Sequence, residues 1–97
     1  MNLYKLDGKL AVPVDTIEEW YKGLNFGKHV ALEEIGGYVI STVFLGVDHG
    51  FFPDRPLLFE TMIFDPGGRN DYQERCGTWE EAIEMHEAAV AEVIGRL

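Results

Sequence analysis

The chain has 97 residues, which is the length of a single domain with one hydrophobic core. Its net charge is −9, from 17 acidic and 8 basic residues, so we expect no direct binding of nucleic acid or of an anionic membrane. A basic protein surface is a partner that suits this charge, although acidity also serves simply to keep a protein soluble. The hydrophobic fraction of 46% argues against disorder.

The single cysteine, Cys76, allows no internal disulfide, which fits a reducing compartment. The N-terminal residues lack the apolar stretch of a signal peptide, and the longest apolar runs are far shorter than the ~20 residues of a membrane span. These features predict a soluble, cytoplasmic protein.

The first predicted element is a β-hairpin, in which residues 3–6 and 9–12 flank Asp7-Gly8. Asp-Gly between two short apolar segments is typical of a tight hairpin turn. A short helix is predicted next, over residues 15–23, with Asp15 as N-cap and Glu18 completing a capping box. Gly23 and Gly27 are its predicted terminators, and its apolar stripe consists of Ile17, Trp20, Tyr21 and Leu24.

Four strands are predicted in the middle of the chain, over residues 28–35, 38–45, 57–64 and 71–75. The second is rich in β-branched and aromatic residues, and Gly36-Gly37 suits a tight turn before it. Two glycines and two prolines mark 46–56 as a loop. Because the connections are short, the strands should form an antiparallel meander.

The C-terminal segment is predicted to be a helix with Thr78 as N-cap and Glu81 as its capping-box partner. Its apolar side comprises Trp79, Ile83, His86, Val90, Val93 and Leu97, and its acidic side Glu80, Glu84 and Glu87. The predicted fold is therefore one α+β domain over residues 1–97: an antiparallel meander with an N-terminal hairpin, one short helix, and a C-terminal helix packed on the sheet.

The two predicted strands at 38–45 and 57–64 are apolar on both faces. A sheet with one solvated face would alternate more cleanly between apolar and polar residues. The C-terminal helix covers one face, so something else should cover the other. Two alternatives stay open at this point: the helix at 15–23, or a partner, which includes a second copy of the chain in a homodimer.

The polar residues that stand out are Asp48, His49, Glu60, Arg75 and His86. One hypothesis combines Asp48, His49, Glu60 and His86 into a metal or acid–base site. The structural alternative has Asp48 and His49 capping a loop, Glu60 paired with Arg75, and His86 bonded to a backbone carbonyl at the edge of the core. The sequence has no HExxH, CxxC, P-loop or nucleophile-elbow motif, so we assign no catalytic residue, metal or cofactor.

Three further features have both a functional and a structural interpretation. Phe51-Phe52 in a Gly/Pro-rich loop suits an interface anchor or a loop folded over the sheet. Cys76 is a weak candidate for a reactive thiol, because no histidine is fixed near it in sequence. The acidic helix side is suited to mimic a nucleic-acid backbone or simply to be solvated.

Several motifs resemble a family of small phage, prophage and bacterial proteins that has no assigned activity. The resemblance covers nearly the whole chain, and it departs from the family only around 66–71 and at 76–77. It implies a phage or mobile-element setting, hence the host cytosol, and supplies no site residues. The motifs are Tyr-x-Leu-Asp-Gly-Lys at 4–9, Pro-Val-Asp at 13–15, Trp20, Ser-Thr-Val-Phe-Leu-Gly-Val-Asp-His at 41–49, Leu-Phe-Glu-Thr-Met-Ile-Phe at 58–64, Glu74-Arg75, Thr-Trp-Glu-Glu-Ala at 78–82, and His86.

The first functional hypothesis is a non-enzymatic accessory protein that binds another protein, for example to inhibit a host nucleic-acid-handling or defence complex. The alternatives are a small metal-dependent or acid–base enzyme and a minor structural subunit of a phage particle.

Overall fold

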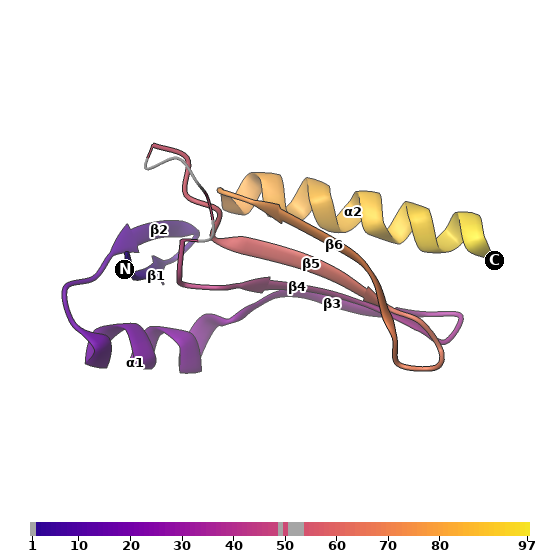
Figure 1. The fold of residues 1–97 in the computed structure, drawn as a ribbon, viewed down its shortest axis with the longest axis horizontal. Coiled ribbons are helices and arrows are strands. Elements are labelled where there is room, and N and C mark those ends of the chain that lie inside the picture. The colour runs from indigo at the N-terminus through magenta and orange to yellow at the C-terminus, as the bar shows by residue number, and fades with distance from the viewer. Residues whose placement is uncertain (1, 49, 51–53) are drawn as a thin grey trace.

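The computed structural model describes residues 2–48, 50 and 54–97, with the backbone only at 25–27. It has two antiparallel sheets and two helices and confirms the predicted α+β class (Figure 1). The elements, in chain order, are β1 Tyr4–Asp7, β2 Leu10–Pro13, α1 Ile17–Gly27, β3 His29–Ile35, β4 Tyr38–Phe44, β5 Phe59–Phe64, β6 Asn70–Cys76 and α2 Trp79–Arg96. None of the described helices is long and apolar enough to cross a membrane.

The main sheet is the predicted meander, with strand order β3-β4-β5-β6 and every neighbouring pair antiparallel. The β1–β2 hairpin forms a separate two-stranded sheet at one end of the molecule, beside α1 (Figure 1). It is attached to the segment that follows β4, where the amide of Tyr4 donates to the Gly46 carbonyl at 2.8 Å. The molecule is elongated, with extents of 45 × 26 × 22 Å.

The core lies between α2 and one face of the main sheet. β4 and β5 present matched residues to the helix, since Ile40 pairs with Ile63 and Phe44 with Phe59, and all four are fully or almost fully buried. On the helix, Ala82 and Ala89 are buried at the contact together with Val93. The sequence pattern misses the two alanines, whose small size allows α2 to approach the sheet closely.

Three contacts hold α2 along its length. At its start, the ring of Trp79 packs edge-on against Phe59 with the centroids 6.4 Å apart. In its middle, His86 is buried against the sheet. At its end, the Arg96 guanidinium donates to both carboxylate oxygens of Asp71, at 3.0 and 2.9 Å, which ties the last turn to β6.

The cap of α2 is confirmed with one difference from the capping box. The hydroxyl oxygen of Thr78 accepts a hydrogen bond from the amide of Glu81 at 3.1 Å, as an N-cap side chain should. The Glu81 carboxylate accepts from the Thr78 hydroxyl at 3.0 Å instead of from the backbone amide. Both bonds fix the first turn of the helix.

The first helix differs from the prediction in its start, its length and its buried side. Thr16, and not Asp15, is the N-cap, and its hydroxyl accepts from the amide of Glu19. Gly23 lies inside the helix and does not end it. A Cβ at Gly23 would lie 2.9 Å from the Lys5 Cβ, so glycine lets α1 pack closely on β1. Of the predicted apolar stripe, Trp20 and Leu24 turn inward, whereas Ile17 and Tyr21 are exposed.

Candidate functional site

The structure does not assemble the hypothetical metal or acid–base site. Glu60 and Thr61 are consecutive in β5 and therefore point to opposite faces of the sheet. His86 lies on the Thr61 side, so the sheet separates it from Glu60. Among the described residues, no group of three His, Cys, Asp or Glu side chains could hold a metal ion.

Asp48 has the predicted loop-capping role. Its Oδ1 accepts hydrogen bonds from the amides of Gly50 and Leu57, at 2.7 and 3.0 Å. One carboxylate oxygen thus closes the base of the loop that connects β4 to β5. His49, Phe51 and Phe52 lie outside the described residues, so the predictions for them are untested.

His86 forms a polar network that the sequence analysis did not identify. Its Nε2 lies 2.9 Å from Glu33 Oε1, and its Nδ1 lies 2.7 Å from Thr42 Oγ1. Thr42 Oγ1 in turn lies 2.5 Å from Thr61 Oγ1. The predicted bond from His86 to a backbone carbonyl is therefore wrong, because side chains of β3 and β4 occupy both ring nitrogens.

The hydrogen-bond roles in this network follow from counting donors. We place a proton on Nε2, which donates to the Glu33 carboxylate, because a carboxylate only accepts. Nδ1 then accepts from the Thr42 hydroxyl, and the Thr42 oxygen accepts from Thr61. Every donor has an acceptor in this arrangement, in agreement with the absence of unsatisfied buried side-chain atoms in the described part of the chain.

Glu33, His86 and Thr42 follow the acid–imidazole–hydroxyl order of nucleophilic catalysis, so their accessibility decides between chemistry and structure. Thr42 and Thr61 have no exposed surface, and His86 is 4% exposed. A nucleophile must reach its substrate, and this hydroxyl lies sealed beneath α2. The network therefore fixes α2 on the sheet. Thr42 between Ile40 and Phe44 was the sequence signal for it: a polar residue on an apolar face.

The second polar cluster lies on the other face of the sheet. Glu60 is 8% exposed, and its Oε2 accepts from Arg75 Nε at 2.8 Å and from Gln73 Nε2 at 2.6 Å. Register explains the contact, since Glu60 stands directly opposite Arg75 in β6. The predicted ion pair is confirmed, and it neutralises the only carboxylate on this face that is buried in the described structure.

Around this cluster the face is mostly apolar, with Glu34, Ser41 and Gln73 as further polar residues, and no described residue covers it. Val39 is only half-buried although its neighbour Ile40, on the helix side of the same central strand, has no exposed surface. Leu32 is 61% exposed. We call this surface the open face; its apolar residues are Leu32, Val39, Val43, Met62 and Phe64.

The position of helix α1 excludes one of the two alternatives for what covers the open face. Helix α1 packs against β1 at the end of the molecule, beyond the main sheet (Figure 1). The hairpin adds to the helix-side core, where Tyr4 and Leu6 contact the cluster around Phe44. The first alternative, cover by the helix at 15–23, is therefore wrong.

Cys76 is a poor nucleophile in this fold. Burial, followed by the negative charge of Glu81, raises the pKa of its thiol to about 11, against the partial opposing effect of a hydrogen bond with the Thr78 backbone. The thiol therefore stays protonated at neutral pH, which disfavours reaction at this position.

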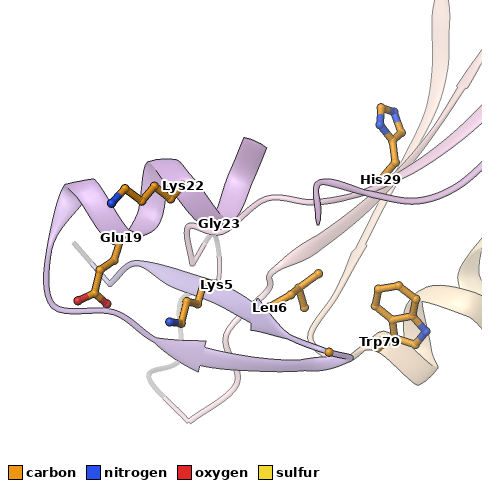
Figure 2. Close-up of a pocket in the computed structure, with 8 residues that line it drawn as sticks. Lys5, Leu6, Glu19, Lys22, Gly23, His29 and Trp79 are labelled. Atoms are coloured by element: carbon orange, nitrogen blue, oxygen red, sulfur yellow. The ribbon is translucent and has the colours of Figure 1, made fainter. Parts of the chain in front are cut away.

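A pocket of about 500 Å³ lies between the hairpin, α1 and the start of α2. It contains the cationic groups Lys5 and Lys22 and, on its far side, His29 and Trp79. In Figure 2 the ammonium groups of the two lysines point away from Trp79 and toward the Glu19 side of the pocket. The charged groups thus do not converge on one ligand position.

No protein-family model, curated protein or solved structure matches this chain. The resemblance of its motifs to the phage and prophage family stays a prediction.

Proposed function

We propose that this chain is a non-enzymatic, phage-type accessory protein that acts by binding another protein chain through the open face. The observation that carries the proposal is the row of apolar side chains on two central strands with no described cover, among them Met62 and Phe64. Leu32 is exposed and the other apolar residues of the face are half-buried, and apolar patches that reach solvent in this way mark protein interaction sites. An antiparallel sheet that serves only as a scaffold has a polar outer face.

The chemical character of the face also suits protein binding. A typical interface has an apolar centre, is enriched in Arg and Met, and is poor in unpaired charge at its core. Here Met62 stands opposite Gln73, and two residues further along the strands the charge of Arg75 is already matched by its bond to Glu60. Docking on this face would therefore bury no uncompensated charge at that pair.

The reactive groups of the described chain support binding rather than catalysis. The hydroxyl of Thr42 is sealed under α2, the Cys76 thiol has a pKa of about 11, and one Asp48 oxygen already accepts two amide bonds.

The motif resemblance supplies the proposed setting, a phage-infected or lysogenic host cytosol. The net charge of −9 favours targets with basic surfaces, such as proteins that handle nucleic acid or belong to a host defence complex. The exposed glutamates of α2, which include Glu80, Glu84 and Glu87, place negative charge on the side of the sheet opposite the open face.

Affinity capture from host extract with matched surface variants tests the proposal. Leu32→Glu places a charge on the open face, and Leu10→Glu makes the same change on the hairpin, where Leu10 is 67% exposed. We expect one protein to be captured equally by the wild type and by Leu10→Glu, and at least tenfold less by Leu32→Glu. Equal capture by all three, with unchanged circular dichroism, would show that the open face is not the binding surface.

A further inference from the structure

We infer that the chain bound on the open face is a second copy of this protein, so that two main sheets pack face to face with the α2 helices outermost. This inference rests on the proposed function only in taking the open face as a protein-binding surface. It specifies the occupant, and with it the symmetry: each copy uses the same residues.

The shape of the face allows this packing. Three rows of side chains cross the strands, and the middle row is formed by Leu32, Ser41, Met62 and Gln73, which stand opposite one another in the register. The rows on either side place Val39 beside Phe64 and Val43 beside Glu60. Side chains standing on two such faces interdigitate when the sheets pack about 10 Å apart, as in β-sandwiches.

The area is sufficient for a weak dimer. Four strands at about 4.8 Å spacing and six residues at about 3.4 Å give a face of roughly 20 Å by 20 Å. Allowing for the relief of the side chains, two such faces bury on the order of 1,000–1,200 Å² in total, the lower limit for a specific interface. We therefore expect a dissociation constant in the micromolar range, about 1–100 μM.

The charge distribution favours a copy of the chain in this orientation. Residues 1–28 contain four lysines and four acids, so the whole net charge of −9 belongs to residues 29–97. Helix α2 carries five exposed glutamates on the side of the sheet opposite the open face, at positions 80, 81, 84, 87 and 92. Contact through the helices would bring these charges together. Contact through the open faces leaves them on the order of 30 Å apart, well beyond the Debye length of about 8 Å.

The polar groups of the open face also fit a self-complementary contact. Arg75 and Glu60 neutralise each other within one chain, and Glu34, which has no ion pair among the described residues, lies at the rim of the face in the edge strand β3, opposite Val39. A second copy brings the same internally paired charges and the same apolar rows to the contact, so its apolar centre meets an apolar centre.

Light scattering coupled to size exclusion, with sedimentation equilibrium from 5 to 500 μM, tests the inference. We expect the wild type and Leu10→Glu to approach twice the 11.0 kDa chain mass, and Leu32→Glu to dissociate at least tenfold more readily. Met62→Glu, in the middle row, should act in the same direction. Because net charge opposes association, raising the salt from 50 to 500 mM should strengthen the dimer several-fold.

The outcomes separate this inference from the proposed function. A wild type that remains monomeric at 500 μM, while Leu32→Glu still abolishes capture of another protein, overturns the dimer and leaves the proposed function standing. A dimer that Leu32→Glu and Met62→Glu leave intact, or that weakens in high salt, also overturns the inference. If neither mass nor capture responds to these variants, both proposals fail.

Discussion

The imidazole Nδ1 of His86 lies 2.7 Å from the hydroxyl of Thr42, and this contact joins α2 to β4 in the interior. Thr42 is the central member of the network, since it also bonds to Thr61 of the neighbouring strand. One hydroxyl thus links the helix to both central strands. Its removal should affect stability more than any other single change in the network.

The two threonines should contribute unequally. We expect Thr42→Val to lower the free energy of unfolding by about 1–3 kcal/mol, because it leaves His86 Nδ1 and the Thr61 hydroxyl without partners. Thr61→Val removes one bond and should cost about 1 kcal/mol. The double variant should be no less stable than Thr42→Val, because the second change removes a donor that already lacks its partner. Urea unfolding measures all three, and strictly additive losses would contradict the network.

Removing one partner of the ion pair on the open face should lower the free energy of unfolding more than replacing both partners by apolar residues. Arg75→Met leaves the Glu60 carboxylate with Gln73 alone, and we expect a loss of about 1–3 kcal/mol, reduced because the Arg75 side chain is 35% exposed. Glu60→Met combined with Arg75→Met should return most of this loss, since no buried charge remains. Arg69→Met, in the turn before β6, is the matched control. A double variant less stable than Arg75→Met would count against this account.

Two glycines in the left-handed region should respond differently to alanine. Gly46 has a φ of 73°, and a Cβ there would lie 2.7 Å from Trp20 Nε1, the atom that donates to the Gly46 carbonyl. Gly8 has a φ of 63° with open space around it. We expect Gly8→Ala to cost about 1 kcal/mol from backbone strain alone, and Gly46→Ala about 2–4 kcal/mol from strain plus the lost Trp20 contact. Thermal unfolding ranks the two, and equal losses would contradict the close approach.

The thiol of Cys76 should be unreactive in the folded protein. Its pKa is raised from 9.0 to about 11, so at pH 8 the thiolate fraction should be about 100-fold below that of an ordinary thiol. Iodoacetamide should therefore react slowly with the native chain and at the ordinary rate in 8 M urea. The raised pKa also means that stability falls as the pH rises from about 9 to 11, because the unfolded state ionises first. A native rate equal to the unfolded rate would show that burial does not suppress the thiolate.

Local sequence signals predicted the order and the type of the helices and strands. Asp7-Gly8 and Gly36-Gly37 mark turns because only a few residue types tolerate their backbone angles, and Thr78 caps α2 through a bond to a residue three positions away. The pairing of Glu60 with Arg75 was also predictable, since antiparallel neighbours with a short connection set the register. The least reliable boundaries were those of α1, where Gly23 serves packing instead of termination.

Only the tertiary structure decided which groups meet through α2 and which face of the sheet no described residue covers. Glu33 and His86 are 53 residues apart in sequence. No local pattern specifies the orientation of α2 that places His86 Nε2 2.9 Å from Glu33 Oε1. The sequence by itself determined that both faces of β4 and β5 are apolar, because strand alternation is a property of consecutive residues. It left the place of α1 undetermined, since that depends on a close approach to β1 at Gly23, and close approaches depend on the whole packed chain.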